Sequence, residues 1–324
     1  MKLVAVEEHF LPHVVRDAWA IAAADDPTAA FDRGEIGARL EDLGAGRIAL
    51  MDEAGVDVQV LSLTTPGLHN LAAADSAALA RHTNDLIAGA VARRPDRFQG
   101  FAALPTPAPD AAPRELERAV RDLGLKGAMV CGRTRDKHLD HPDFQPLFAC
   151  AAELGVPVFI HPQIPLRAVR DANYAGFDPE TDLALAAYGL GWHYEAGLQF
   201  VRLVLAGTFD RHPGLQVILG HWGEVVLFYL ERLAALQRVA KLDRPVADYV
   251  RDNLYVTASG MFSLDYFRRC VEIVGLDRVL FSTDYPYQYR PGRQARGYLD
   301  RLPLDDADRA KLAHGNWERL THRD

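Results

Sequence analysis

The chain has 324 residues, of which 49% are hydrophobic and 25% charged, and its formal net charge is −8. This composition predicts a globular protein with a large core and excludes a disordered chain. An acidic chain without a run of basic residues also argues against a nucleic-acid partner. Neither a signal-peptide pattern nor an apolar run of the ~18 residues that span a bilayer is present, so we expect no membrane partner and a cytoplasmic location.

The three cysteines, Cys131, Cys150 and Cys270, lie far apart and form no Cys-x-x-Cys pair. This spacing indicates neither a disulfide framework nor a thiolate zinc site. We therefore expect buried or unreactive thiols in a reducing compartment.

Short apolar runs alternate with helical patterns along the chain. The runs that predict buried strands are residues 3–6, 56–63, 98–104, 127–132, 156–162, 215–221, 254–260 and 278–284. Helices are predicted over residues 75–94, 112–124, 143–155 and 224–240. In the last of these, a stripe predicts a face that packs on the core; it consists of Val225, Phe228, Leu230 and Leu233.

Eight strands separated by helices favour a parallel sheet that closes into a (β/α)8 TIM barrel, rather than an open doubly wound sheet. No glycine-rich phosphate-binding motif follows a predicted strand, which removes the main support for a nucleotide-binding fold. Residues 1–324 are thus expected to form one barrel domain. Residues 10–47 and 163–192 are too long for plain connections, and we interpret them as lid insertions.

Reactive side chains follow four of the predicted strands. They are Glu7 and His9 after the first, His161 after the fifth, His221 after the sixth and Asp284 after the eighth. In a barrel these strand ends meet at one mouth. Glutamate, histidine and aspartate together form a nitrogen and oxygen donor set suited to Zn²⁺ or Mn²⁺.

Alternation along the first strand separates its two glutamates. Side chains of a strand point alternately to opposite faces, so Glu7 and His9 are expected to share a face with Leu3 and Ala5. Glu8 would then share the other face with Val4 and Val6. We expect Glu8 to have a structural role toward the helices, for instance by pairing with an arginine.

Two further clusters are weaker signals. His138 and His141 are three residues apart in a polar loop and are expected to be surface residues. The arginines after the last strand would either attract an anion or lie in a solvated loop; they are Arg290, Arg293 and Arg296.

Four motifs resemble the amidohydrolase-2 branch of the amidohydrolase superfamily. They are Glu7-x-His9, FIHP at 159–162, GHWGE at 220–224 and STDYPYQY at 282–289. Within that branch the chain resembles the metal-dependent aromatic acid decarboxylases, which act on γ-resorcylate, 2,3-dihydroxybenzoate or 5-carboxyvanillate. The first strand carries Glu-x-His instead of His-x-His and the fourth ends without a lysine, so the resemblance implies one divalent metal ion, Zn²⁺ or Mn²⁺.

The resemblance also implies roles for the residues of the mouth. Glu7, His9, His161 and Asp284 would be the metal ligands. His221 would lie beside the open coordination position, with Glu224 orienting it. A 2-hydroxybenzoate would chelate the ion through its carboxylate and phenolate oxygens, and Asp284 would protonate the ring carbon that bears the carboxylate before CO₂ leaves.

Substrate-binding roles are implied for Arg39, Thr64, Arg232 and Tyr287. In such relatives an arginine equivalent to Arg232 can reach the site of a neighbouring subunit, which implies a homodimer or homotetramer. Cys131 stands where enzymes of the resorcylate type have asparagine, so this chain departs from their pattern at one substrate contact.

The leading hypothesis is therefore a non-oxidative decarboxylase of a small aromatic acid with an ortho hydroxyl group. The alternative within the superfamily is a mononuclear metal-dependent hydrolase of a lactone or cyclic ester. A metal-binding barrel without catalytic activity is the third possibility.

Overall fold

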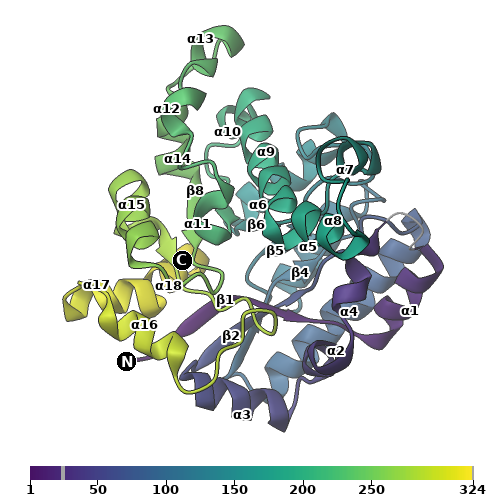
Figure 1. Cartoon of the computed structure of the whole chain (residues 1–324), viewed down its shortest axis with the longest axis vertical. Helices are drawn as coiled ribbons and strands as arrows, with labels where there is room; N and C mark the ends of the chain where they lie inside the picture. Colours follow the sequence, from purple (N-terminus) through teal and green to yellow (C-terminus); the bar gives the residue numbers. More distant parts are fainter. Residues whose placement is uncertain (23–25, 323–324) are drawn as a thin grey trace.

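The computed structural model describes residues 1–22 and 26–322, which form parallel strands surrounded by helices (Figure 1). The strands are β1 Val4–Phe10, β2 Val58–Leu63, β3 Phe98–Gly100, β4 Ala102–Ala103, β5 Ala128–Cys131, β6 Val158–His161, β7 Val217–Leu219, β8 Leu254–Thr257 and β9 Val279–Leu280. The helices of the first half are α1 His13–Ala22, η1 Pro27–Phe31, α2 Gly34–Glu41, α3 Ala45–Ala54, α4 Ala73–Arg93, α5 Ala112–Arg121, η2 Pro142–Phe144 and α6 Gln145–Leu154. Those of the second half are α7 Arg167–Asn173, α8 Pro179–Ala184, η3 Leu185–Gly189, α9 Gly191–Leu205, α10 Thr208–Arg211, α11 His221–Glu224, α12 Leu230–Leu233, α13 Leu236–Ala240, α14 Val246–Asn253, α15 Leu264–Val274, η4 Leu276–Arg278, α16 Gln294–Arg301, α17 Asp306–Ala310, η5 Lys311–Gly315 and α18 Asn316–Thr321.

Every strand pairing is parallel, in the orders β1-β2-β3 and β4-β5-β6-β7-β8-β9. Only Phe101 separates β3 from β4, and its N–H donates to the Leu61 carbonyl. Backbone bonds also join β1 to the end of the sheet, from Val6 N–H to the Phe281 carbonyl (3.0 Å) and from His9 N–H to the Tyr285 carbonyl (2.7 Å). The order and direction of the strands are those predicted for the barrel.

A separate apolar cluster fills the space that the strands enclose. Each strand position of the barrel contributes to it: Val4, Val6, Val58, Val60, Phe101, Met129, Phe159, Ile218, Tyr255 and Leu280. Trp317 and Leu320 of α18 complete the cluster, and the Trp317 indole N–H donates to the Gln99 side chain at 2.7 Å. The alternate strand residues pack under the helices, so the strands are buried on both faces.

The prediction that Leu3 and Ala5 share the inward face of Glu7 and His9 is wrong. Val4 and Val6 lie in the interior cluster, whereas Leu3 and Ala5 pack in the outer core. Pairing with β2 shifts register between Ala5 and Glu8, which is the local irregularity of a β-bulge. Because the bulge breaks the alternation, Val6 and Glu7 both point inward, and strict parity could not have placed them.

Glu8 points to the outer side of the strand and joins three segments. Its carboxylate accepts from the Thr283 N–H (2.8 Å), the Thr283 hydroxyl (2.6 Å) and the Gln59 amide (3.0 Å). Arg47 completes the network by donating to Gln59 at 2.7 Å and to the His9 carbonyl at 2.8 Å. Glu8 is therefore linked to an arginine through Gln59, and the network fixes the backbone of β1 against the chain after β9.

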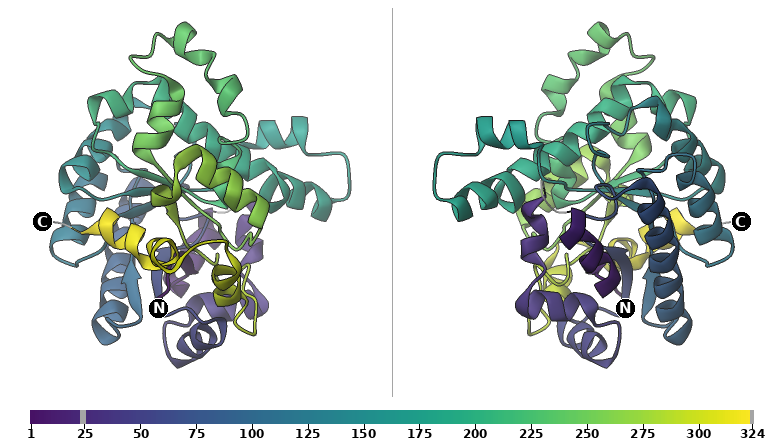
Figure 2. Two further views of the ribbon diagram at one scale, coloured as in Figure 1. Left: turned by 90° about the vertical axis from the view of Figure 1, so that its left-hand side faces the viewer. Right: turned by 90° about the vertical axis from the view of Figure 1, so that its right-hand side faces the viewer.

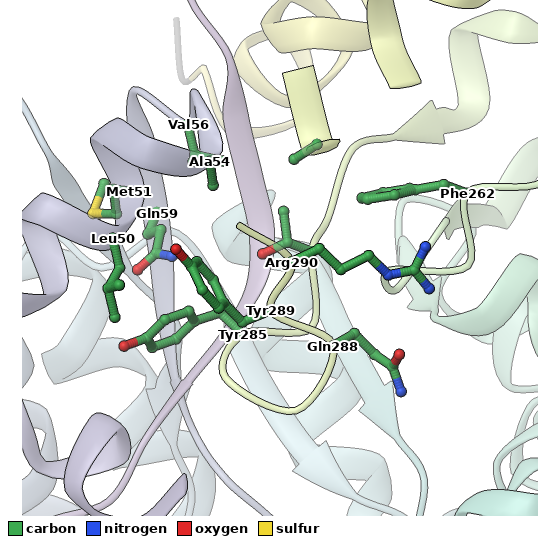
Figure 3. A pocket seen from close by; sticks show the side chains of 12 residues that line it. Leu50, Met51, Ala54, Val56, Gln59, Phe262, Tyr285, Gln288, Tyr289 and Arg290 are labelled. Atoms are coloured by element: carbon green, nitrogen blue, oxygen red, sulfur yellow. The ribbon is translucent and has the colours of Figure 1, made fainter. Parts of the chain in front are cut away.

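Figure 3 shows the small pocket that Gln59, Tyr285 and Tyr289 line beside this network. Its cavity measures about 10 Å³, which is room for a single water molecule. The Arg47 guanidinium lies 4.4 Å from the centre of the Tyr285 ring and helps to fill this side of the barrel. An aromatic acid cannot enter here.

The single helix predicted over residues 224–240 is wrong. Residues 221–225 all have positive φ, a conformation that interrupts a helix, and the chain continues in the short helices α12 and α13. Leu230 and Leu233 pack partly on the core, but Phe228 is 82% exposed and does not belong to a packed stripe. Figures 1 and 2 show α12 and α13 projecting from the barrel; residues 226–240 are called the arm below.

Both predicted lid insertions contain helices. Residues 10–47 include α1, η1 and α2, although residues 23–25 lie outside the part that the structure describes. Residues 163–192 include α7, α8 and η3, and in Figure 2 α7 and α8 form a second projection. Of the helices in the described chain, none has the length and apolar character to cross a membrane.

Candidate metal centre

Three side chains meet at the carboxyl ends of β1 and β6. One donor atom from each of Glu7, His9 and His161 lies within 4.8 Å of the other two, and all three side chains are buried. Glu7 Oε1 is 3.9 Å from His161 Nε2, and the two imidazole rings meet edge to face with centres 4.8 Å apart. The parallel strands thus bring together residues that are more than 150 positions apart in the sequence.

Both histidines are oriented through their Nδ1 atoms. His161 Nδ1 lies 2.9 Å from the Pro162 carbonyl, which can only accept, so Nδ1 carries the proton and Nε2 has a free lone pair. His9 Nδ1 contacts the Ser62 hydroxyl at 3.2 Å. Burial lowers the pKa of His9 to about 3, with Arg47 and His221 adding to the effect, and it lowers the pKa of His161 well below its usual range. Both rings are therefore neutral, as metal binding requires.

One oxygen of Glu7 is bound by hydroxyl groups, and the other has no hydrogen-bond partner within residues 1–22 and 26–322. Oε2 accepts from Thr257 (3.2 Å), Ser282 (3.4 Å) and Ser259. Burial raises the pKa of Glu7 to about 8, partly opposed by the charge of His221. These hydroxyl groups were not predicted, although Thr257 and Ser259 lie within the predicted strand 254–260 and Ser282 within the predicted strand 278–284.

The free atoms of this cluster fit a divalent cation. Glu7 Oε1 and His9 Nε2 are buried and have no hydrogen-bond partner among the described residues. Leaving a polar group in this state costs about 1–3 kcal/mol, more if it is charged. Gly220 keeps the space open, because a Cβ there would lie 2.7 Å from Ser259 Oγ and 3.1 Å from Glu7 Oε1. A metal ion bound by both free atoms would remove this cost.

Asp284 lies next to the three donors. Its Oδ1 is 3.3 Å from His9 Nε2, and 10% of its side chain is exposed. Burial raises the pKa of Asp284 to about 7, while the charges of His221 and His193 act in the opposite direction. The carboxyl group is thus near enough to serve as a fourth donor or as a proton carrier.

A second cluster joins His221 to Glu224. His221 Nδ1 lies 2.6 Å from Glu224 Oε1, and His193 Nδ1 lies 2.8 Å from Glu224 Oε2. Burial alone would lower the pKa of His221, but the Glu224 carboxylate raises it to about 10. Burial would likewise raise the pKa of Glu224, but His221 and His193 hold it at about 2. His193 was not predicted, because it follows no strand and belongs to no motif.

These three residues also have the composition of a metal site. Their contacts differ from those of the first cluster, because each oxygen of Glu224 already faces a histidine nitrogen. In the described chain, none of their buried side-chain nitrogen or oxygen atoms lacks a partner. We therefore interpret this cluster as a hydrogen-bonded triad, and the first cluster is the candidate metal centre.

Backbone strain is concentrated around the same mouth. The residues with positive φ that are not glycine include His221, Trp222, Glu224, Val225, Ser259 and Asp284. Left-handed backbone costs free energy for such residues, and clusters of it are typical of functional sites.

Two of the four predicted substrate-binding residues meet near the metal centre. The Thr64 hydroxyl lies 2.7 Å from the Tyr287 hydroxyl, and the Tyr287 ring centre is 5.8 Å from that of His9. Tyr287 also donates to Asp32, a buried residue in the 10–47 insertion that the sequence did not indicate. Burial raises the pKa of Asp32 to about 7, although the Tyr287 hydrogen bond opposes this.

The other two lie apart from this pair. Arg39 binds Glu35 at 2.5 Å and stacks over the Tyr289 ring at 4.7 Å. Arg232 is on the exposed helix α12. Within this chain, the described contacts bring neither arginine to the metal centre.

The remaining predicted groups have separate surroundings. Cys131 ends β5 opposite His161, and burial raises the pKa of its thiol to about 12, so it is a neutral group beside the mouth. His138 contacts Gln199 at 2.9 Å and is half-buried. Arg296 is paired with Asp57 at 2.6 Å.

Comparison with known proteins identifies the family. The family model described as "Amidohydrolase" matches residues 8–321, so the chain belongs to the amidohydrolase family, as its motifs predicted. A curated relative, the γ-resorcylate decarboxylase of Rhodococcus jostii, is 35% identical over 97% of this chain and 96% of its own length.

Two solved structures share the fold over nearly the whole chain. One is the dihydroxybenzoic acid decarboxylase of Polaromonas sp. JS666 with manganese and 2-nitroresorcinol, at a TM-score of 0.84 and 31% identity, covering 99% of this chain and 96% of that one. The other is the 5-carboxyvanillate decarboxylase of Novosphingobium aromaticivorans with manganese and 4-hydroxy-3-methoxy-5-nitrobenzoic acid, at 0.91 and 29%, with coverages of 99% and 96%. The (β/α)8 prediction is thereby confirmed.

The neighbouring glutamates of β1 provide a matched pair of variants. Glu7→Gln should weaken Mn²⁺ binding by at least ~10-fold, since it replaces a free donor oxygen of the centre. Glu8→Gln should retain the metal but lower the unfolding free energy by about 1–3 kcal/mol, because an amide brings a donor group to a position where the partners already donate. Isothermal titration with Mn²⁺ and urea unfolding of both variants measure these effects. The reverse pattern would contradict the assignment of faces on β1.

Asp32 should make stability depend on pH. Its pKa is raised from 3.8 to about 7 in the folded chain, so its contribution to stability is complete below pH 4 and is lost as pH rises through 7. Asp32→Asn should remove that loss. The unfolding free energy of the variant minus that of the original protein should therefore increase by more than about 1 kcal/mol between pH 4 and pH 8. Urea unfolding across this range measures it, with exposed Asp17→Asn as control. If the unfolding free energies of Asp32→Asn and the original protein differ by the same amount at every pH, the prediction is contradicted.

Proposed function

We propose that the protein is a metal-dependent, non-oxidative decarboxylase of an aromatic carboxylic acid with an ortho hydroxyl group. The proposal rests on the convergence of Glu7, His9 and His161 beside Asp284, with one buried donor atom each of Glu7 and His9 that no described residue hydrogen-bonds. Decarboxylases of this type among the relatives, at about a third identity over almost the full length, support it.

We infer that one divalent ion is held by Glu7, His9 and His161, with Asp284 as the fourth ligand. The donor set suits Mn²⁺ and Zn²⁺, and the manganese in two solved relatives favours Mn²⁺. Such an ion supplies positive charge for the carboxylate and phenolate oxygens of the substrate.

The residues around this centre have separable roles. Asp284, which lies beside the three donors, carries the proton that is delivered to the ring carbon bearing the carboxylate. Cleavage of the carbon–carbon bond then releases CO₂ and returns the electron pair to the ring. His221, held as a cation by Glu224, stabilises the negative charge of the bound acid. Thr64 and Tyr287 form the wall on the His9 side and bind the substrate ring.

Turnover of hydroxybenzoates tests the proposal. Protein loaded with Mn²⁺ should release CO₂ from at least one of 2,6-dihydroxybenzoate, 2,3-dihydroxybenzoate and 5-carboxyvanillate. Asp284→Asn should lower kcat by ~10²–10⁴-fold, because the proton donor is lost. Lactone opening without CO₂ release would identify a hydrolase instead. If the protein is fully occupied by metal but converts neither the aromatic acids nor the lactones, the remaining hypothesis is a metal-binding barrel without catalytic activity.

We further propose a cytoplasmic protein of one domain whose two insertions act as lids, assembled as a homodimer or homotetramer. The arm supports assembly, because Phe228 and Val239 are 82% and 73% exposed. Exposure of large apolar side chains to water is unfavourable, and a second copy could cover them. Since Arg232 makes no described contact with its own metal centre, we infer that it completes the site of a second copy.

Mixing two inactive variants tests this arrangement. Arg232→Ala and Asp284→Asn should each be inactive alone. Refolded together as dimers, they should recover about a quarter of the original activity, since half of the dimers would be mixed and each mixed dimer has one complete site. No recovery, although mass spectrometry detects mixed dimers, would contradict a shared site, and a monomeric mass would contradict assembly.

A further inference from the structure

His193 contacts one carboxylate oxygen of Glu224, and His221 contacts the other. Its Nδ1 is 2.8 Å from Glu224 Oε2, while His221 Nδ1 is 2.6 Å from Oε1. The two imidazole rings approach with their centres 4.5 Å apart. Glu224 is almost completely buried, at 1% exposure, so both contacts to its carboxylate are shielded from bulk solvent.

The contacts of the other ring nitrogen determine which way the His193 proton points. The Trp192 indole N–H, which can only donate, lies 3.1 Å from His193 Nε2. His193 therefore has its proton on Nδ1 and donates it to Glu224. The Tyr188 carbonyl is 3.2 Å from the same Nε2 and would accept a bond if the ring were doubly protonated. In either state His193 remains a donor to Glu224.

Helix α9, which bears His193, makes a second close contact with the turn that contains Glu224. His193 lies in the first turn of α9, and Gly197 follows one turn later. A Cβ at Gly197 would lie 2.2 Å from the Glu224 carbonyl oxygen, so only glycine allows this approach. Helix α9 thus holds the strained turn at residues 221–225 through its backbone as well as through the Glu224 side chain.

We propose that His193 is a positioning residue: it fixes the Glu224 carboxylate, so that Glu224 holds His221 with Nε2 directed at the metal centre. The effect on catalysis rests on the proposed decarboxylase function, whereas the effect on the His221 hydrogen bond does not. The raised pKa of His221 is consistent with this geometry, since it arises from the Glu224 carboxylate and from the nearby charges of Glu7 and Asp284. Trp192 ends the 163–192 insertion and links it to the triad, because its indole N–H donates to His193 at 3.1 Å. Its ring centre is also 6.5 Å from that of His161.

Two substitutions separate a donated hydrogen bond from simple packing. His193→Phe keeps a ring but removes the donor to Glu224. His193→Asn places an amide N–H close to the position of the imidazole Nδ1. Leu198→Ala, at an exposed position of α9, controls for general effects on the helix.

The first measurement needs no substrate. The Nδ1 proton of His221 in its short bond to Glu224 should give a downfield signal in the proton NMR spectrum, assigned by its loss in His221→Gln. We expect this signal to move upfield or broaden in His193→Phe and to stay unchanged in His193→Asn and Leu198→Ala. An unchanged signal in His193→Phe overturns the proposal.

The second measurement compares kcat with KM. His193→Phe should lower kcat by ~10–100-fold, the usual cost of losing an outer hydrogen-bond partner, with Mn²⁺ affinity unchanged and kcat largely restored in His193→Asn. Equal kcat in His193→Phe and the original protein overturns the catalytic part of the proposal. If the original protein decarboxylates none of the acids, the proposed function fails, and the NMR measurement alone decides whether His193 positions His221.

Discussion

The candidate metal centre depends on a small set of buried polar atoms that have no hydrogen-bond partner in the part of the chain that the structure describes. Glu7 Oε1 and His9 Nε2 face the interior of the mouth, near the free nitrogen of His161. A folded chain keeps such atoms unpaired only at a cost in stability, and several of them converging is not a stable arrangement without a cation. The same arrangement orients three donor atoms toward one point, where a metal ion would bind.

The surrounding residues maintain that orientation. On the inner side, hydroxyl groups bind the far oxygen of Glu7, and backbone or side-chain oxygens bind the far nitrogens of the two histidines. On the outer side, Glu8 ties β1 to the chain that carries Asp284. The triad of His193, Glu224 and His221 supports the remaining wall. Strained backbone at His221 and Asp284 is tolerated because these contacts fix it from both sides.

The sequence predicted the parts of this arrangement that follow from strand order. The strand ends at Glu7, His9, His161, His221 and Asp284 could be found because parallel strands of a barrel deliver their carboxyl ends to one mouth. The bulge in β1 could not be foreseen, since it depends on pairing with β2, and the correct face of Glu7 was obtained from an alternation that the strand does not keep. Asp32 belongs to the 10–47 insertion and His193 to α9, just after the 163–192 insertion, and only tertiary packing brings these residues to the site. The run of positive φ that breaks the helix predicted at 224–240 has no clear signal in its residues, four of which are not glycine.

We propose that the cluster of Glu7, His9 and His161, and not the triad around Glu224, binds the metal of a decarboxylase. Anomalous diffraction from crystals grown with Mn²⁺ and 2,6-dihydroxybenzoate tests it most directly. We expect one manganese peak, bonded to Glu7, His9, His161 and Asp284, with the aromatic acid at the same ion. A peak between His193 and Glu224, or no peak at the first cluster at full Mn²⁺ saturation, would contradict it.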